Sequence, residues 1–439
     1  MLEDSADLAA CIVAGLLIGS TVIPCNPNSA RRAMREYLSI CQPHMVIASA
    51  ATIKHQETID PGIWLGIKLV TEESDFVAMF DNQQLLSVPN SNSLSTAFML
   101  FTSGGSGKIK AVVHDHASIQ AVATNMGQKT WHFGQTDVVY NTSKLSFGYG
   151  LNYNLMCSLM AGATAILRRK MPTHPAVLDI VNQHRPTIFA SVPGIYNALL
   201  AGDADLSCFR ARLCISGGEM LPQYLPTKWH DKTGTEILET YGLTEINCAP
   251  LVNRPDHNRR GSVGTEVAGI ECEIRDELGN VCAPGAIGQL YVKSPSIGKG
   301  YHDNPLATDK TFQGEWIATG DRFTQDHQGF FSFIGRINDM FKVNAQWVSP
   351  VEIERALVDH AMILEAGVTS IIDHEGLTKV GAFVVADPAT DLPTNFQRQL
   401  QKFISNKLEH FKIPHKIFVV DQLPKNVNGK LQRSLLTNP

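Results

Sequence analysis

The feature that most constrains the fold is an alternation of apolar strand-like runs with helical patterns over the first two-thirds of the chain. Strand-like runs occupy residues 44–48, 163–167 and 187–190, and a helical pattern covers 176–184. Such alternation predicts a parallel, doubly wound α/β architecture. From 261 to 333, short strands with closely spaced glycine and proline replace it, which predicts a small antiparallel β-barrel or sheet.

The chain length predicts more than one domain. A chain of 439 residues is too long for one ordinary domain. We expect a large domain at residues 1–337, with 261–335 as its β-barrel subdomain. A polar segment at 335–339 then leads to residues 338–439, which suffice for a small α+β domain.

Composition excludes several classes of protein. The chain is 44% hydrophobic and 18% charged, so a large core can form. Its net charge of −5 gives no basic surface for nucleic acid. Nine cysteines without a CxxC pair favour reduced thiols in the cytosol over a disulfide framework or a zinc site. We therefore expect a cytoplasmic protein that does not bind nucleic acid.

One apolar stretch near the N-terminus, residues 8–23, is a false signal for targeting. The residues before it are acidic, whereas a signal peptide needs a basic leader. At about 16 residues with internal glycines it is also short for a membrane span. We expect a buried helix at 5–14 and a buried strand at 21–24, with no membrane span.

A loop rich in glycine and hydroxyl residues follows an apolar strand at 97–101. Glycines let the backbone approach a polyphosphate, hydroxyls donate to its oxygens, and Lys110 supplies charge. It is not a Walker A loop, because no Gly-Lys-Ser/Thr closes it. The alternative is a flexible surface turn. The loop residues before Lys110 include Thr102, Ser103, Gly104, Gly105, Ser106 and Gly107.

Two further segments, 216–222 and 240–245, follow predicted strands. Open α/β sheets place their ligands at such strand-end loops. In the second segment Tyr241 can stack on a base, Thr244 can bond a phosphate, and Glu245 can hold Mg²⁺. The alternative is that Thr244, with the acid after it, is a helix N-cap.

Two charged residues further along complete the set. Asp321 follows a glycine and can accept both ribose hydroxyls, although an aspartate in a turn is the commoner role. Lys430 lies nine positions from the C-terminus. If the loop before Lys110 and Lys430 serve one active site, a movable domain must carry Lys430 to it.

Together and in this order, these segments resemble the adenylate-forming superfamily of acyl- and aryl-CoA synthetases, adenylation domains and luciferases. The resemblance covers nearly the whole chain and is most specific at 335–342 and 424–433. Within the superfamily, the chain is most similar to benzoate-CoA ligases and related aryl-CoA ligases, on segments 143–151, 185–193 and 342–352. This resemblance implies the α/β fold above, with a mobile C-terminal domain.

The resemblance also implies a two-step reaction. A carboxylate attacks the α-phosphate of ATP to give acyl-AMP and pyrophosphate, and the thiol of CoA then displaces AMP. Lys430 would bridge the two anions, since cations must gather where negative charge builds. Lys110 and loop 102–107 would hold pyrophosphate, with Glu245 on Mg²⁺ and Thr244 on a phosphate oxygen. The implied adenosine contacts are Gly217, Gly218, Glu219, Tyr241, Gly242, Asp321 and Arg336, and the implied pivot between domains is Asn338.

The resemblance implies an acyl pocket of mostly small residues. Cys248 and Ala249 are smaller than the residues usual in benzoate ligases, so the pocket should admit a substituted ring, such as hydroxy- or aminobenzoate. A change of one methylene-sized contact shifts specificity by only ~1–3 kcal/mol. The implied pocket residues are Phe147, Gly148, Tyr149, Gly242, Cys248 and Ala249.

Three departures from the family pattern leave alternatives open. Gly105 replaces a hydroxyl residue, and Ala345 stands where glycine is usual, near the path of the thiol arm. Family members also carry further residues before the point where this chain begins, so the chain is a natural short form, has a wrongly assigned start, or needs a partner. Besides an aryl-CoA ligase, it could be an adenylation enzyme that loads a carrier protein, or a non-catalytic binding protein.

Overall fold

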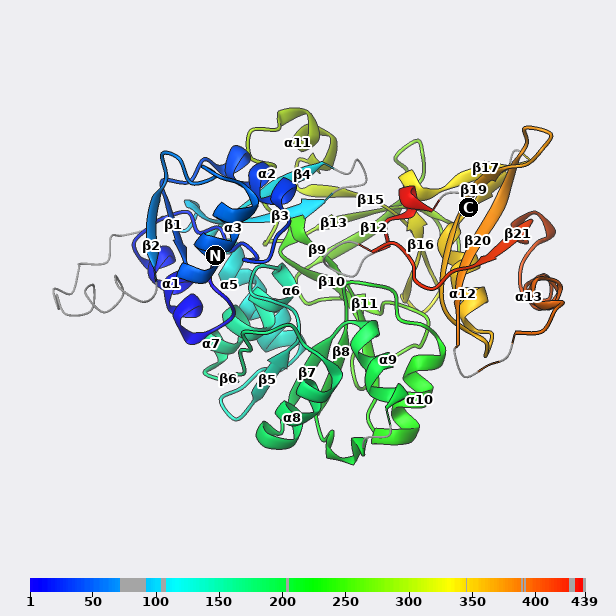
Figure 1. Ribbon diagram of the computed structural model, residues 1–439, viewed down its shortest axis with the longest axis horizontal. Coiled ribbons are helices and arrows are strands. Elements are labelled where there is room, and N and C mark those ends of the chain that lie inside the picture. Colours follow the sequence, from blue (N-terminus) through cyan, green and yellow to red (C-terminus); the bar gives the residue numbers. More distant parts are fainter. Residues whose placement is uncertain are drawn as a thin grey trace.

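The computed structural model describes residues 1–71, 92–103, 108–202, 205–344, 346–387, 390, 392–425 and 431–436. Several predicted functional residues lie outside these ranges: Gly104, Gly105, Ser106, Gly107, Ala345 and Lys430. The N-terminal elements lie at one end of the molecule and the C-terminal elements at the other (Figure 1). No helix in the described ranges is both long and apolar enough to cross a membrane.

The N-terminal elements pack around two short sheets. Ser5 caps the first helix by accepting a hydrogen bond from the Leu8 backbone N–H at 3.2 Å. One sheet is the parallel pair β1–β2 and the other is the antiparallel hairpin β3–β4. The elements of this region are α1 (Ala6–Leu17), α2 (Arg31–Cys41), β1 (Met45–Ala48), α3 (Ala50–Ile59), β2 (Lys68–Thr71), β3 (Thr96–Ser103), β4 (Ile109–Asp115), α5 (His116–Val122) and the π-helix η1 (Ala123–Thr130).

A seven-stranded sheet forms the centre of the large domain. Its order is β11-β10-β9-β8-β7-β5-β6, parallel from β6 to β9 and antiparallel from β9 to β11. The strands are β5 (Val138–Asn141), β6 (Thr164–Ala165), β7 (Ile188–Ser191), β8 (Leu213–Ser216), β9 (Ile237–Leu243), β10 (Cys248–Val252) and β11 (Thr265–Glu266). The helical elements between them are α6 (Gly148–Gly150), η2 (Leu151–Cys157), α7 (Ser158–Ala161), α8 (His174–His184), α9 (Pro193–Ala201), η3 (Leu206–Cys208), α10 (Tyr224–Thr233) and η4 (Thr244–Ile246).

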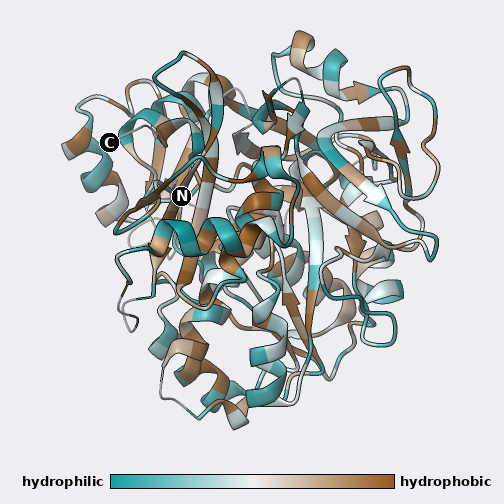
Figure 2. Ribbon diagram, turned by 90° about the vertical axis from the view of Figure 1, so that its right-hand side faces the viewer, coloured by the Kyte–Doolittle hydropathy of each residue, from teal (hydrophilic) through white to brown (hydrophobic). Residues whose placement is uncertain are grey.

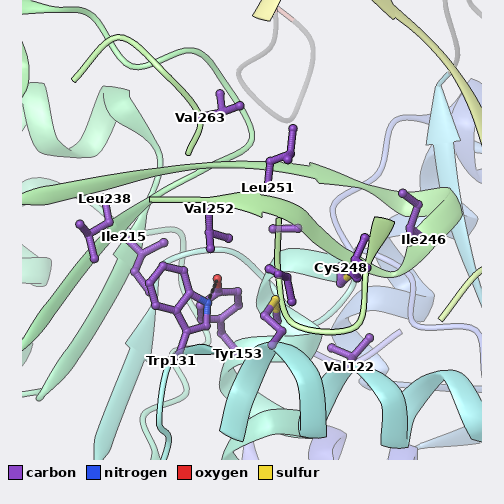
Figure 3. Packing of buried hydrophobic residues seen from close by; sticks show 14 of the residues in the cluster. Val122, Trp131, Tyr153, Ile215, Leu238, Ile246, Cys248, Leu251, Val252 and Val263 are labelled. Atoms are coloured by element: carbon purple, nitrogen blue, oxygen red, sulfur yellow. Dashed lines mark hydrogen bonds between the residues drawn. The ribbon is translucent and has the colours of Figure 1, made fainter. Parts of the chain in front are cut away.

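Successive residues of these strands face opposite sides of the sheet, and each side has its own hydrophobic core. Val139, Ile188 and Leu213 belong to one core together with Trp131 and Tyr153. The Trp131 indole N–H donates to the Tyr153 hydroxyl at 3.0 Å, so this buried polar pair is satisfied (Figure 3).

The second core lies on the other face of the same strands. Tyr140, Phe189 and Cys214, each the next residue after a member of the first core, pack there with Val177 of α8 and Trp229 of α10. Helices alternate between hydrophobic and hydrophilic residues along their length, as expected for helices with one face on a sheet (Figure 2). The predicted doubly wound architecture is confirmed.

The region rich in glycine and proline, predicted at residues 261–333, forms a five-stranded antiparallel half-barrel. Its order is β12-β13-β15-β14, and β16 pairs with β15. Its elements are β12 (Glu271–Arg275), β13 (Gly288–Lys293), α11 (Pro305–Thr311), β14 (Phe312–Gln313), β15 (Trp316–Gln325), β16 (Phe331–Arg336) and the 3-10 turn η5 (Ile337–Asp339). The predicted pivot Asn338 lies in η5 and is exposed.

The C-terminal elements form an α+β unit with its own core. Strands β19 and β20 are antiparallel, β21 joins β20 in parallel, and helices α12 and α13 contribute Ile353 and Leu400 to the core. The elements are β17 (Phe341–Val343), β18 (Gln346–Val348), α12 (Pro350–Val358), β19 (Ile363–Ile372), β20 (Thr378–Ala386), α13 (Phe396–Ser405), η6 (His410–Lys412), β21 (Lys416–Val419) and η7 (Arg433–Leu435).

Three local expectations need correction. The N-terminal helix runs on to Leu17, and the strand expected at 21–24 is a single bridge between Val22 and Phe98. The strand expected at 163–167 is only Thr164–Ala165, because β6 is an edge strand that pairs with β5 alone. Segment 240–245 was expected to be a loop, but β9 continues through Leu243, because β10 pairs with it there and satisfies its backbone groups.

Candidate active site

A cleft of about 410 Å³ lies where the large domain meets the C-terminal elements. Six residues predicted to contact a nucleotide line it: Gly218, Glu219, Tyr241, Gly242, Asp321 and Arg336. The facing wall comes from the C-terminal part of the chain and mixes apolar residues with six charged ones: Asp339, Glu354, Arg355, Glu365, Lys425 and Arg433. The cleft is therefore shared between two parts of the fold that are far apart in sequence.

Asp321 is the centre of the polar group in the cleft. Its carboxylate accepts a hydrogen bond from the Tyr241 hydroxyl at 2.5 Å, and Arg336 Nε lies 3.5 Å from its other oxygen. Asp321 and Arg336 are register partners on β15 and β16, so the strand pairing itself brings them together. The Tyr241 ring packs against Phe323 and Phe333. The structure thus brings three residues predicted as nucleotide contacts into one group.

The loop after β8 approaches the same group closely. A Cβ atom at Gly217 would lie 2.8 Å from Thr240 Oγ1, so only glycine fits there. Gly218 has a φ of +85°, which also favours glycine. Gly217 is buried behind the cleft lining, whereas Gly218 and Glu219 line it. The Gly217 N–H donates to the Ser191 carbonyl at 3.2 Å, so the backbone of this loop is held against the end of β7.

A second group lies outside the cleft lining, at hairpin β3–β4. Thr102 pairs with Lys110 across the hairpin, and Ser103 pairs with Ile109. The Lys110 ammonium lies 3.9 Å from the centre of the Tyr301 ring, and the Tyr301 hydroxyl donates to Glu245 Oε1 at 2.7 Å. Burial lowers the pKa of Lys110, and the nearby Glu245 opposes this shift. Lys110 and Glu245, separated by 135 positions in sequence, are therefore neighbours.

The buried imidazole of His114 joins this group to η4. His114 Nε2 lies 2.9 Å from the carbonyl oxygen of Thr244, and its ring stacks on Phe98. Burial lowers the pKa of His114 to about 4. The ring is therefore neutral near pH 7, and its Nε2–H donates to Thr244. Among the described residues, no hydrogen-bond partner reaches Nδ1.

The residues around Glu245 suit a magnesium ion that arrives with a nucleotide. Mg²⁺ usually binds through one or two carboxylates, with phosphates and water completing its octahedron. Within the part of the chain that the structure describes, no cluster of three or more His, Cys, Asp or Glu side chains could hold a metal. Glu245 is a single carboxylate beside a cationic lysine, which fits a metal–phosphate complex and not an all-protein site.

The residues predicted for the acyl pocket are partly brought together. Tyr149 Cζ lies 3.5 Å from a Cβ built on Gly217, and the Tyr149 hydroxyl donates to the Ile215 carbonyl at 3.2 Å. A Cβ on Gly242 would meet Cys248 O at 3.5 Å and Ala249 Cβ at 3.9 Å. Of the predicted acyl-pocket residues, Gly242 lines the cleft. The others do not line it: Phe147, Gly148, Tyr149, Cys248 and Ala249.

Cys248 is buried, and its thiol is neutral. Burial raises the pKa of its thiol to about 12, and its Sγ lies 3.6 Å from Ser296 Oγ. It sits at the start of β10, next to Ile246 and facing Tyr153 and Val122 in the core (Figure 3). The neutral thiol therefore adds no charge to this part of the large domain.

Arg433 secures the C-terminal segment on the facing side of the cleft. It bonds both oxygens of Glu354 and the Val368 carbonyl, and its Nε lies 3.6 Å from Asp339 of η5. Lys425 and Leu431, which flank residues 426–430, form a β-bridge with each other, and both line the cleft. Lys430 itself lies outside the described residues.

Glu239 and Arg355 lie on opposite walls of the cleft. Burial raises the pKa of Glu239 on β9 to about 7, and Arg355 of α12 opposes the shift. One oxygen of Glu239 accepts from the Leu221 backbone N–H at 3.1 Å. Both side chains line the cleft. The charge of Arg355 therefore acts on the pKa of a residue in the large domain.

Sequence motifs did not identify four residues of these groups: Tyr301, His114, Glu239 and Arg355. The partner of each residue lies on a distant segment of the sequence, so no local sequence motif identifies the residue. A partial signal existed for Glu239, an acid directly before the 240–245 segment on an otherwise apolar strand, where a charge must have a partner.

Comparison with known proteins gives two family matches. The AMP-binding enzyme family matches residues 1–302, and the AMP-binding enzyme C-terminal domain matches residues 352–430. A 4-hydroxybenzoate–CoA/benzoate–CoA ligase from Rhodopseudomonas palustris is 36% identical over 77% of this chain, a match that spans 64% of that ligase's length. A 3-hydroxybenzoate–CoA ligase from Aromatoleum sp. is 31% identical over 99% of this chain and 84% of its own length.

The solved structures give the same relationship. A benzoate CoA ligase from Burkholderia xenovorans superposes with a TM-score of 0.91 at 32% identity, covering 99% of this chain and 88% of that chain. The fold described above is therefore shared over almost its full extent.

Proposed function

Because the chain belongs to the AMP-binding enzyme family, we propose that it activates an aryl carboxylate with ATP and transfers the acyl group to the thiol of CoA. The observation that carries this proposal is the convergence of two groups of residues from distant segments. Lys110 and Glu245 meet at Tyr301, and Asp321 and Arg336 meet at the cleft. One group suits the phosphates of ATP and the other suits its ribose.

In the proposed first step, the substrate carboxylate attacks the α-phosphate and pyrophosphate leaves. Lys110 holds the charge of the departing phosphates, and Asp321 accepts hydrogen bonds from the ribose hydroxyls. Glu245 would hold Mg²⁺, which, when bound, neutralises phosphate charge. We assign to Lys430 the bridge between carboxylate and α-phosphate, because two anions must meet there.

In the proposed second step, the CoA thiol attacks the acyl carbonyl and AMP leaves. We propose that the C-terminal domain turns about Asn338 between the steps, so that Lys430 serves only the first. The exposed position of Asn338 in a short turn between β16 and β17 supports a pivot there.

For the substrate we propose a benzoate with a ring substituent. The small, neutral residues Cys248 and Ala249 support this, and the relatives named above include ligases for two hydroxybenzoates. The direct test is ATP–pyrophosphate exchange with benzoate and its hydroxy- and amino-derivatives. We expect the highest kcat/KM for a substituted ring. A much higher kcat/KM for benzoate than for every derivative would contradict the substrate proposal, and no exchange with any acid would contradict the function.

A further inference from the structure

Tyr301 lies on a short segment that runs alongside strand β4. The Val113 N–H donates to the Gly300 carbonyl at 3.0 Å, and the Lys299 and His302 N–H groups each donate to β4 carbonyls at 2.8 Å. On the other side, the Gly298 N–H donates to the Glu245 carbonyl at 2.9 Å. The backbone of this segment therefore joins β4, which carries Lys110, to η4, which carries Glu245.

The Tyr301 side chain makes the same connection a second time. Its ring lies 3.9 Å from the Lys110 ammonium, a cation–π contact, and its hydroxyl donates to Glu245 at 2.7 Å. The ring is buried, and Phe312 packs edge-on against it at 5.4 Å between centroids. Burial and the adjacent Glu245 raise the pKa of Tyr301, so its hydroxyl keeps the proton it donates.

A lysine and a glutamate this close would otherwise pair with each other. Among the described residues no ion pair joins Lys110 to Glu245, although the charge of Glu245 acts to raise the pKa of Lys110. A direct ion pair would reduce the charge that each side chain offers to a ligand. Tyr301 gives each of them a different partner, a ring face for the cation and a hydroxyl for the anion.

We propose that Tyr301 is a positioning residue for Mg²⁺-ATP, whose hydroxyl orients Glu245 toward the metal and whose ring orients Lys110 toward the phosphates. The inference rests on the proposed function, because that function makes Mg²⁺-ATP the ligand of this group. In this proposal the hydroxyl and the ring of Tyr301 have separate roles, which can be tested by removing the hydroxyl and the ring separately.

The experiment compares Tyr301→Phe, which removes only the hydroxyl, with Tyr301→Leu, which removes the ring as well. The first readout is the rise in Tm that the non-reactive analogue α,β-methylene-ATP produces at a series of Mg²⁺ concentrations, which needs no carboxylate substrate. The second is the KM for ATP and the kcat of ATP–pyrophosphate exchange at saturating Mg²⁺. Tyr291→Phe, in β13 and away from this group, is the matched control.

For Tyr301→Phe we expect the half-saturating Mg²⁺ concentration to rise about tenfold, the effect of one hydrogen bond to a charged group. Excess Mg²⁺ should restore the Tm rise and the KM for ATP to within about twofold of wild type. For Tyr301→Leu we expect the KM for ATP to stay about fivefold or more above wild type at any Mg²⁺ concentration, because a desolvated cation–π contact is also lost. The Tm of each unliganded variant is measured first, so that weaker folding is recognised as such.

Two results would overturn the inference: an unchanged Mg²⁺ dependence in Tyr301→Phe, or the same behaviour in Tyr301→Phe and Tyr301→Leu. The failure of the proposed function looks different. The Tm of the wild-type protein would then rise with nucleotide and Mg²⁺, but the protein would show no ATP–pyrophosphate exchange with any aryl acid. The Tyr301 variants would still change the Mg²⁺ concentration at which half of the Tm rise is reached. If the Tm of the wild-type protein does not rise with nucleotide and Mg²⁺ together, both the proposed function and the proposed role of Tyr301 are wrong.

Discussion

The two groups of candidate functional residues are built in different ways. The first, which we call the phosphate group, comprises Lys110, His114, Glu245 and Tyr301, and all of its members belong to the large domain. The second, the shared cleft, has Asp321 and Glu239 on one wall and Arg355 on the other, and its walls come from two parts of the fold. The phosphate group is held together by hydrogen bonds and a cation–π contact, whereas the shared cleft has charged side chains on two walls that come from different parts of the fold.

This difference suggests a division of function. In the proposed cycle, a group completed within one domain would keep its geometry when the other domain turns, which suits the phosphates of ATP. A cleft with two walls changes when the domains move, so it suits steps that must be switched on and off. The following changes test this division, in order of expected effect.

The largest effect is expected from Lys430→Ala. Loss of the cation between two anions should lower aryl-AMP formation about a thousandfold. Transfer from supplied aryl-AMP to CoA should remain within a few-fold of wild type, because Lys430 serves only the first step in our proposal. Each half-reaction is measured separately, with Lys416→Ala, at an exposed lysine on β21, as the control. Equal loss in both half-reactions would remove the basis for domain rotation.

The next effect concerns His114 in the phosphate group. The folded protein keeps this ring neutral down to a pKa of about 4, whereas the unfolded chain binds a proton near pH 6.5. The free energy of unfolding should therefore fall as pH drops from about 6.5 to 4, by up to about 3 kcal/mol from this residue. Urea unfolding of unliganded protein across this range measures the slope. His114→Gln should flatten it, and an unchanged slope would show that His114 is not responsible.

A smaller effect is expected from Asp321→Asn in the shared cleft. An amide accepts hydrogen bonds more weakly than a carboxylate and cannot balance Arg336, so the KM for ATP should rise about tenfold. The kcat at saturating ATP should change less, because the ribose does not react. Asp276→Asn, in an exposed turn of the half-barrel, serves as the comparison. A fall in kcat with no change in KM would place Asp321 at the reacting atoms instead.

The smallest effect is expected from Glu239→Gln. Burial holds the folded pKa of Glu239 at about 7, above its unfolded value of 4.5, so the protein loses stability as pH rises through this window. Glutamine keeps an acceptor for the Leu221 N–H and removes the charge. The variant should melt at a higher temperature than wild type at about pH 8, with little difference at about pH 4.5. Lower stability at the higher pH would mean that attraction to Arg355 outweighs burial.

The sequence predicted the parts of the molecule that local patterns encode. The two cores follow from strands whose successive residues are both apolar. Asp321 and Arg336 were implied by the family resemblance, although Asp321 lies within β15 and not in the turn that was the alternative. Tyr301 and His114 could not be found in this way, because their partners lie on segments 56 and 130 positions away. The continuation of β9 through Leu243 was also missed, since only pairing with β10 makes a strand of residues whose local sequence reads as a loop.

The most direct test of the account is product analysis of the wild-type protein. It is incubated with ATP, Mg²⁺, CoA and each benzoate derivative in turn, and the products are identified by mass spectrometry. We predict aryl-CoA and AMP in equal amounts, with the most product from a ring-substituted benzoate. AMP formed without any aryl-CoA, or aryl-AMP that reacts with a phosphopantetheinylated carrier protein and not with CoA, would contradict the proposed acceptor, and no product from any acid would contradict the proposed activity.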